Sequence, residues 1–279
     1  MSQSPGAAAR PVPQARAPFV PQASPVWRLY RRLVRTEVAF FTPPDAVPDA
    51  DVLKLCIQPA PTPGACNFSC PTIIIDLSPS EEELWNGIES KSRKVIRQAM
   101  REAITVNDVP LTEENWITFR AAHETLRSRK RKADALGVGQ ISDLVAKGEY
   151  VMTTSRNADG TVLSWHGYAR NHTHVRLLNT VSAIDPARDT AWNNLVGRAN
   201  RLHHWQDMLR FKSESIRHYD LGGVYRGEDD PEQMNIARFK KSFGGAIVDR
   251  FDAVLPLTGK GRIAVALSGL ISAEARSGT

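Results

Sequence analysis

The chain has 279 residues, and its 42% hydrophobic and 24% charged content is ordinary for a globular protein, which excludes a fibrous or wholly disordered chain. It carries 36 Lys and Arg against 30 Asp and Glu, a formal net charge of +6. No segment approaches the roughly 20 consecutive apolar residues that a membrane-spanning helix needs, so we predict a cytoplasmic protein without a membrane span.

The positive charge is concentrated in four basic clusters. These lie at residues 28–35, 91–101, 127–132 and 238–241. Such clusters suit an anionic partner, for example a phosphate-rich cosubstrate, tRNA or a nucleotide-linked sugar. A solvated helix face is the simpler interpretation of any single cluster, so the clusters alone assign no partner.

The first half of the chain begins with a tail and continues with mixed elements. Residues 1–25 are dense in Pro, Ala, Gln and Ser, which is typical of a disordered tail. Ser80 and Glu83 have the spacing of a capping box, which marks the start of a helix. Hydrophobic periodicity predicts a helix, two strands, a helix, a strand and a helix over residues 26–41, 51–58, 72–77, 80–102, 104–109 and 112–131.

The second half has a different order of elements. A helix precedes three strands that are separated by tight polar turns, and two further strands alternate with two helices. The predicted ranges are 141–147, 150–154, 162–170, 175–181, 191–212, 217–221, 233–243 and 246–254, with Thr190 as the N-cap of the long helix.

Two phrases near the C-terminus are the most informative motifs of the chain. The first reads His-Tyr-Asp-Leu-Gly-Gly-Val over residues 218–224, a short strand that ends in an acid and two glycines, where backbone can approach a ligand closely. The second runs from Asn235 and contains Ala-Arg-Phe-Lys-Lys-Ser-Phe, a basic amphipathic helix that ends at Gly244 and Gly245.

These two phrases, in this order, resemble the C-terminal signature of the Fem-like aminoacyltransferases and their relatives in the GNAT acyltransferase superfamily. The segment Lys-Ser-Arg-Lys-Val-Ile-Arg-Gln-Ala at 91–99 is similar to a helix of the same family. The element order over about 145–255 is also that of a GNAT core. The polysaccharide-associated acetyltransferases are related to this branch.

The resemblance implies an α/β fold of the α+β kind. We expect a GNAT-like mixed, mainly antiparallel sheet flanked by helices, preceded by a partial GNAT-like half-domain. The implied division is a tail at 1–25, an N-terminal half-domain at 26–140, an acyltransferase core at 141–257 and a C-terminal extension at 258–279.

The resemblance also implies an enzyme that moves an acyl or aminoacyl group from an activated ester to an amine or hydroxyl. The donor cosubstrate is acyl-CoA or aminoacyl-tRNA, and no cofactor is bound permanently. The acceptor is a sugar, a cell-envelope precursor or a small metabolite. The alternative is a non-catalytic basic nucleic-acid-binding module, although no stacking platform or binding motif is visible.

Three residues of the two phrases are the catalytic candidates. In Fem-like enzymes the Lys after the Phe lies near the donor, which points to Lys240 as the residue that stabilises charge on the carbonyl oxygen. Asp220 can orient the acceptor or accept its proton, but an Asp before Gly also commonly caps a turn. Tyr219 can protonate a leaving group, and a core position is its alternative.

The binding candidates include two arginines of the first half. Arg93 and Arg97 are four residues apart on one helix face, where they can contact phosphate or carboxylate, or form interdomain salt bridges instead. Lys241 is assigned to the donor site as well, with solvation of its helix as the alternative. The other candidates for donor or substrate binding are Gly222, Gly223, Tyr225, Arg226, Phe239 and Arg188.

One departure from ordinary GNAT enzymes concerns the donor. Those enzymes bind the CoA pyrophosphate with a Gly-rich turn at a helix N-terminus. Residues 182–190, which precede the long helix, contain no glycine. CoA binding of that type is therefore in doubt, and Arg188 is the remaining phosphate contact of this loop.

Cysteine and histidine spacing predicts no metal site. Cys56, Cys66 and Cys70 are an odd number without a nearby fourth ligand, so reduced thiols are expected. His172 and His174 flank a turn, and the adjacent His203 and His204 sit within a helix. Turn polarity and helix surface are the predicted explanations for these histidines.

Overall fold

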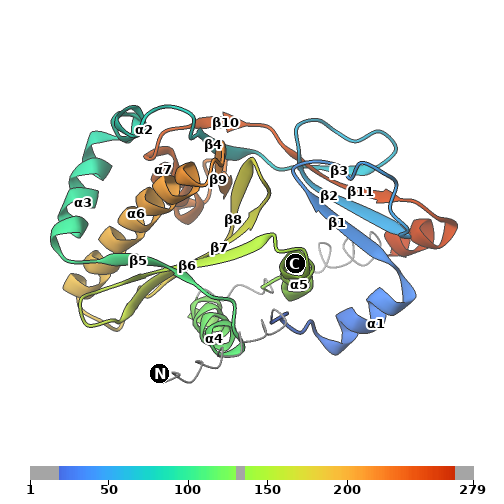
Figure 1. The fold of residues 1–279 in the computed structure, drawn as a ribbon, viewed down its shortest axis with the longest axis horizontal. Coiled ribbons are helices and arrows are strands. Elements are labelled where there is room, and N and C mark those ends of the chain that lie inside the picture. The colour runs from blue at the N-terminus through green and yellow to red at the C-terminus, as the bar shows by residue number, and fades with distance from the viewer. Residues whose placement is uncertain (1–18, 130–135, 268–279) are drawn as a thin grey trace, which may run out of the picture.

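The computed structural model describes residues 19–129 and 136–267. Two sheets lie side by side, a seven-stranded one and a four-stranded one (Figure 1). The predicted tail at 1–25 lies mostly outside the described residues, as do 268–279 of the predicted extension and the last residues of the helix predicted at 112–131. Across the described ranges, no helix combines the length and apolarity needed to cross a bilayer.

The seven-stranded sheet carries the two C-terminal phrases. Its strand order is β10-β4-β9-β8-β7-β6-β5, and every neighbouring pair is antiparallel except β8 and β9. This mixed, mainly antiparallel sheet confirms the predicted fold class. The strands are β4 (Thr72–Asp76), β5 (Thr105–Val109), β6 (Tyr150–Arg156), β7 (Val162–Arg170), β8 (His174–Ser182), β9 (His218–Gly223) and β10 (Ala246–Val248).

The four-stranded sheet has the order β1-β2-β11-β3, formed by β1 (Thr36–Phe40), β2 (Val52–Gln58), β3 (Cys66–Ser69) and β11 (Phe251–Pro256). Two strands that precede residue 140, β4 and β5, belong to the seven-stranded sheet. Conversely, β11, which follows residue 140, belongs to the four-stranded sheet. The division at 140 stays a prediction. The three cysteines form no disulfide.

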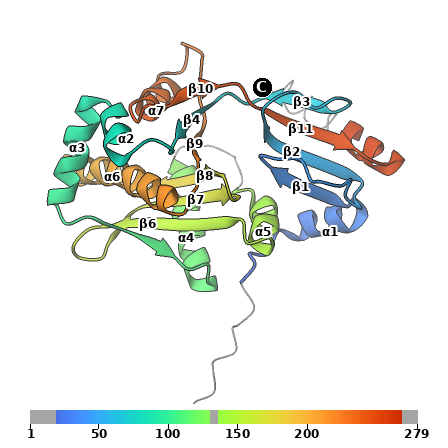
Figure 2. The ribbon, with the colours of Figure 1, turned by 45° about the horizontal axis from the view of Figure 1, so that its top comes forward.

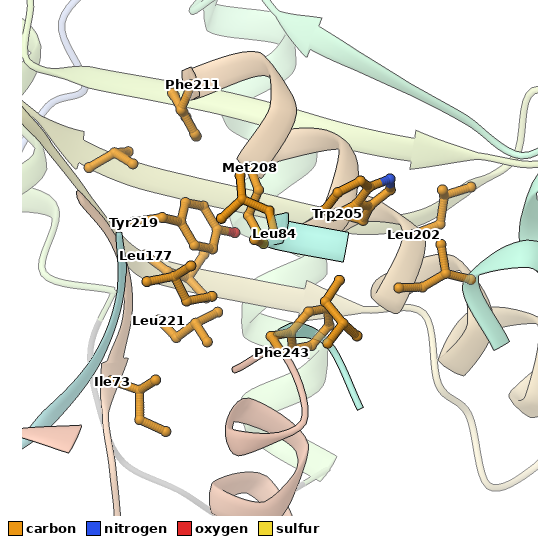
Figure 3. Packing of buried hydrophobic residues seen from close by; sticks show 14 of the residues in the cluster. Ile73, Leu84, Leu177, Leu202, Trp205, Met208, Phe211, Tyr219, Leu221 and Phe243 are labelled. Atoms are coloured by element: carbon orange, nitrogen blue, oxygen red, sulfur yellow. The ribbon is translucent and has the colours of Figure 1, made fainter. Parts of the chain in front are cut away.

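Two apolar cores hold helices against the seven-stranded sheet. One contains side chains of α2 (Glu81–Gly87), α3 (Ser90–Arg101), α6 (Thr190–Ser213) and α7 (Pro231–Lys241), as well as β4, β8 and β9 (Figures 2 and 3). The other contains α4 (Glu113–Arg129) and α5 (Val138–Ala146) with β6, β7 and β1. Each core buries the apolar stripe that the sequence periodicity identifies.

Three predicted elements are wrong in part. The helix at 26–41 ends early, as α1 (Pro25–Leu33), because the alternating residues of β1 pair in parallel with β2. The helix at 80–102 is two helices, since Ile88 has extended backbone (ψ 137°) and is 1% exposed. The strand at 246–254 is divided between β10 and β11, which belong to different sheets.

The helix starts are set by local chemistry. The Ser80–Glu83 capping box is present, which confirms that prediction. The N-cap of α6 is Asp189 and not Thr190, because the Asp189 carboxylate accepts a hydrogen bond from Trp192 N at 2.7 Å. Asp230 caps α7 in the same way, with Pro231 in its first turn.

Candidate functional site

The site is built where β8 and β9 separate. These parallel strands pair only from His174 and His218 to Arg176 and Asp220. Beyond that register β8 remains paired with β7, while β9 remains paired with β4. The seven-stranded sheet therefore has a gap on the C-terminal side of Arg176 and Asp220, which we call the β8–β9 gap.

A buried ion pair closes the near end of the β8–β9 gap. Arg176 Nη1 lies 2.6 Å from Asp220 Oδ2, and the side chains are 10% and 1% exposed. Asp220 Oδ1 accepts the Gly222 amide at 2.7 Å and also contacts the Thr72 hydroxyl. Such contacts offset the cost of removing both charges from water. Asp220 therefore has the contacts of the turn-capping alternative, and its role toward an acceptor stays a prediction.

Gly222 shapes the other strand at the β8–β9 gap. Its φ is +80°, and a Cβ there would lie 3.1 Å from the Leu177 carbonyl oxygen and 3.7 Å from Lys240 Nζ. Only glycine adopts this backbone without strain while leaving room for both groups. Gly222 is buried and Gly223 is exposed, so the strand reaches the surface within one residue.

Lys240 reaches the β8–β9 gap from α7. Its ammonium donates to the Gly223 carbonyl oxygen at 2.6 Å. Partial burial, and then the charge of Arg176, lower the pKa of Lys240 to about 8. An ammonium has three donors, so two remain for another partner. The next residue, Lys241, is exposed. The half-buried Phe239 packs against Phe243, with 5.2 Å between the two ring centroids.

A β-bulge lies on β8 beside the β8–β9 gap. Gly167 of β7 pairs with Asn179, whereas the next residue, Tyr168, pairs with Leu177. Leu178 is therefore an extra residue outside the ladder. Bulges of this kind redirect backbone groups and are common beside active sites. The sequence analysis did not identify the bulge and gave 175–181 as one uninterrupted strand.

Tyr219 lies on the opposite face of β9 from Asp220. Its side chain is fully buried in the α6 core, and its hydroxyl lies 2.8 Å from both Tyr168 Oη and His204 Nδ1 (Figure 3 shows its packing). Burial, and then the nearby Asp207 charge, raise the pKa of Tyr219 well above its ordinary value. The structure thus places Tyr219 in the core position that the sequence left as the alternative.

The histidines of α6 correct the sequence analysis. His203 and His204 were expected on the helix surface, yet their exposed fractions are 0% and 2%. They form a buried polar network with Asp207 and with His166 and Tyr168 of β7. The signal that could have revealed it is the stripe of Asn200, His203, His204 and Asp207 on one helix face, opposite alternate polar residues of a strand.

His166, His203 and Asp207 are the residues to consider as a metal site. Their ligand atoms lie within 4.8 Å of one another, and all three residues are buried. The two imidazole rings, however, are stacked with centroids 3.7 Å apart and planes 9° from parallel. Their lone pairs lie in parallel planes, so one tetrahedral ion cannot accept both without rotating a ring. As arranged, the group fits hydrogen bonding better than a metal.

Arg93 and Arg97, which were both predicted to bind the donor, have different surroundings in the structure. Arg93 donates to the carbonyl oxygens of Asn86 and Ile88, each at 2.8 Å, and so caps the C-terminus of α2. Arg97 is exposed, with its guanidinium carbon 5.1 Å from the Trp85 ring centroid. It lines a cavity of about 520 Å³ with Trp85 and Trp205, and Lys240 is not among the residues that line this cavity.

The remaining predicted residues lie on surface loops. Arg188 stacks on Trp192, with its guanidinium carbon 3.6 Å from the ring centroid. Arg226 forms an exposed ion pair with Asp249 at 2.8 Å. Tyr225 is half-buried and its hydroxyl contacts Asp229. Of the predicted set, the structure brings Gly222, Gly223, Asp220 and Lys240 together at the β8–β9 gap.

No family model and no curated protein matches this sequence. Among solved structures, the fold is similar to that of FemX, with a TM-score of 0.54 and 14% identity over 67% of this chain and 62% of FemX. L-PGS from Bacillus licheniformis has a TM-score of 0.48 and 12% identity over 79% of this chain and 73% of its own.

A tandem GNAT protein from the clavulanic acid biosynthesis pathway has a TM-score of 0.37 and 15% identity over 73% of this chain and 63% of its own. At such identities the similarity establishes the fold alone. The chain has a Fem-like fold, as its C-terminal phrases predicted, and it spans 62% of the length of FemX.

The buried ion pair gives a first prediction. Asp220→Asn leaves the Arg176 guanidinium buried without its counter-charge, so we expect a loss of about 3–5 kcal/mol in the free energy of unfolding, measured by urea denaturation. Asp249→Asn, which breaks the exposed pair with Arg226, is the matched control and should change stability little. Equal stability of the two variants would contradict the structural role of the pair.

The lowered pKa of Lys240 gives a second prediction. Its ordinary pKa is 10.5 and its folded pKa is about 8, so the folded chain holds fewer protons than the unfolded chain between these values. The contribution of Lys240 to the free energy of unfolding therefore rises with pH between about 8 and 10.5. We expect Lys240→Met to melt at a higher temperature than wild type at pH 7, with the difference shrinking as pH rises above about 8.

Lys241→Met removes an exposed charge from the same helix and serves as the control for this melting series. A Lys240→Met protein that is less stable than wild type at pH 7 would show that burial does not penalise the Lys240 charge.

Proposed function

We propose that this protein transfers an aminoacyl or acyl group from an activated ester to an amine or hydroxyl of a sugar, cell-envelope precursor or small metabolite. The observation that carries the proposal is the position of Lys240. Its ammonium lies in the β8–β9 gap with one hydrogen bond, to the Gly223 carbonyl oxygen. Attack on an ester passes through a tetrahedral oxyanion, and a held, partly desolvated cation is suited to stabilise it.

Aminoacyl-tRNA is the donor that the observations favour. The N-terminus of α6, where a CoA pyrophosphate would bind in an ordinary GNAT enzyme, already holds the Asp189 carboxylate. By contrast, exposed cations line α3, and no ion pair engages them among the described residues: Lys91, Lys94, Arg97 and Arg101. A polyanion fits that surface. Acyl-CoA is the alternative donor.

In the proposed reaction the acceptor nitrogen or oxygen forms a bond to the donor carbonyl carbon, and the tRNA ribose oxygen leaves. Lys240 supplies positive charge to the carbonyl oxygen from α7. The Leu178 amide, outside the β7–β8 ladder, is a second candidate donor from β8. The protein mainly positions the reactants and stabilises charge.

The test compares two lysine variants. Wild type, Lys240→Met and Lys241→Met are incubated with tRNA charged with a mixture of radiolabelled amino acids and a low-molecular-mass fraction of cell extract as acceptor. Transfer is followed by chromatography of the labelled product. Loss of one oxyanion-stabilising donor should lower the Lys240→Met rate roughly 100-fold or more, with Lys241→Met near wild type.

The wild-type rate should also fall as pH rises through about 8, where Lys240 loses its proton, and this alkaline limb should be absent in Lys240→Met. Labelled acetyl-CoA in place of charged tRNA distinguishes the two donors. If folded Lys240→Met transfers at the wild-type rate with either donor, the positive charge comes from elsewhere and the proposal is wrong.

A further inference from the structure

The cavity of about 520 Å³ is lined by residues of α2, α3 and α6, and no step of the proposed reaction uses it. We call it the tryptophan cavity. Its volume is within the range of small-ligand sites in proteins. The lining residues are Glu81, Glu82, Trp85, Arg97, Met100 and Trp205. Two indole rings therefore meet a guanidinium group and two carboxylates around one space.

The indole N–H of Trp205 has no partner in the protein. Trp205 is 3% exposed, and among the described residues no hydrogen bond engages its N–H. This N–H is also not one of the polar atoms that the protein encloses without a partner, so it is open to the cavity that the ring lines. In Figure 3 the nitrogen lies on the side of the ring away from Tyr219. A buried indole usually has a hydrogen-bond partner, so an acceptor on a ligand is expected here.

Trp85 provides an aromatic face in the tryptophan cavity. Its ring meets Trp205 edge-on, with 5.0 Å between the centroids and 60° between the planes. The Arg97 guanidinium carbon is 5.1 Å from the Trp85 centroid, whereas that of Arg188 lies 3.6 Å from the Trp192 centroid. The Trp85 face is therefore not closely covered, and the exposed Arg97 forms no ion pair in the described part of the chain. A planar group can stack on Trp85 beside this guanidinium.

Hydrogen-bond donors and acceptors line the same cavity. Arg97 and Trp205 supply N–H donors, while Glu81 and Glu82 in the first turn of α2 supply carboxylate acceptors. Both glutamates are exposed, and within the described ranges neither forms an ion pair. A purely apolar ligand would leave these groups unused, and the carboxylates would repel a simple anion. The set suits a planar ring with donors and acceptors on its edge, as nucleobases have.

The tryptophan cavity adjoins the basic surface of α3. Arg97 belongs to both, since Lys94 precedes it by three residues and Arg101 follows it by four, on one side of the helix. All three cations are exposed. A phosphate backbone along this row would bring its bases to the cavity. Unpaired RNA bases are commonly recognised by stacking on aromatic rings and guanidinium planes, with hydrogen bonds to their edges.

Contacts between α3 and α7 hold the tryptophan cavity in a fixed relation to the β8–β9 gap. The Ser92 hydroxyl donates to Ser242 Oγ at 3.0 Å, and the Glu89 amide donates to the Ser242 carbonyl oxygen at 2.9 Å. Ser242 follows Lys240 by two residues, and Ser92 precedes Arg97 by five. A ligand that reaches both sites therefore meets them at one set separation, and tRNA is the proposed donor with the length to do so.

We propose that the tryptophan cavity binds one unpaired nucleobase of the donor tRNA, an inference that rests on the proposed function. The base stacks on Trp85 and accepts a hydrogen bond from the Trp205 N–H. Its exocyclic amine donates to Glu81 or Glu82, which favours adenine, cytosine or guanine over uracil. The cations of α3 hold the neighbouring phosphates. The bound base orients the tRNA and leaves the aminoacyl ester free to reach Lys240.

The first experiment follows the indole N–H signals of the six tryptophans by ¹⁵N NMR. Trp205→Phe and Trp192→Phe assign the two signals that matter. CMP should shift the Trp205 signal, and UMP, which has a carbonyl oxygen in place of the amine, should do so only at higher concentration. Ribose 5-phosphate has no base and should leave the signal unchanged. The Trp192 signal is the internal control, because its N–H already donates to the Ala183 carbonyl oxygen at 2.9 Å.

The same spectra recorded with tRNA and with CoA identify the source of the base. We expect uncharged tRNA to shift the Trp205 signal. A Trp205 signal that neither CMP nor tRNA moves overturns the proposal. So does a shift caused by CoA and not by tRNA, because the base bound in the cavity would then be the adenine of a CoA donor.

The second experiment separates stacking from charge in tRNA binding. Trp85→Leu removes the stacking face, so we expect tRNA affinity to fall about tenfold while its dependence on salt stays the same. Arg101→Gln, the matched variant on the basic surface, should instead reduce the slope of log affinity against log salt concentration by about one. Wild-type tRNA affinity in Trp85→Leu overturns the proposal.

A double variant, Glu81→Met with Glu82→Met, keeps the proposal testable if Trp85→Leu does not fold. Both side chains are exposed, so the fold should survive their replacement. We expect this protein to lose the preference for CMP over UMP, and an unchanged preference overturns the proposal. Neither experiment requires transfer activity. A wild-type protein that binds tRNA through the tryptophan cavity but transfers nothing contradicts the proposed function alone.

Discussion

The ion pair between Arg176 and Asp220 is the interaction on which the site depends. It joins β8 to β9 at the last residue where the two strands pair, and the β8–β9 gap begins beyond it. Because successive residues of a strand point to opposite faces, Asp220 serves this pair while Tyr219 faces α6. One short strand therefore connects the cation at the β8–β9 gap with the buried network behind it. Gly222 then provides the backbone turn that brings the Gly223 carbonyl oxygen to Lys240.

Some of the buried polar groups lower the stability of the folded protein. Lys240 keeps a charge that burial disfavours, and Arg201 Nε and Asp207 Oδ1 are buried without partners among the described residues. An apolar interior would be more stable at these positions. Groups of this kind are commonly found where a protein acts on a ligand. Arg201 and Asp207 lie on α6 and Lys240 lies on α7, beside the apolar core that these helices share with β4, β8 and β9.

Local signals in the sequence predicted β4, β7, α6 and the Ser80 capping box, because β-branched runs, helical periodicity and side-chain caps act within a few residues. The C-terminal phrases also identified the fold, whereas the catalytic role of Lys240 stays a prediction. The split of 246–254 between two sheets was not predictable, since pairing with β4 or β2 is a long-range choice. His203 and His204 were missed for a related reason. The sheet decides which face of α6 is buried. Ser164 of β7, 39 residues earlier in the chain, is a partner of His203, and Tyr219 of β9 is the partner of His204.

The central claim is that transfer takes place at the β8–β9 gap beside Lys240. Photo-crosslinking with tRNA charged with benzoylphenylalanine, which places the reactive group on the aminoacyl moiety itself, tests this most directly. After irradiation and proteolysis, mass spectrometry locates the labelled residues. We expect crosslinks within 177–179, 221–224 or 239–240, and their loss when uncharged tRNA is added in excess. Crosslinks confined to the cavity lined by Trp85, Arg97 and Trp205 would contradict the claim.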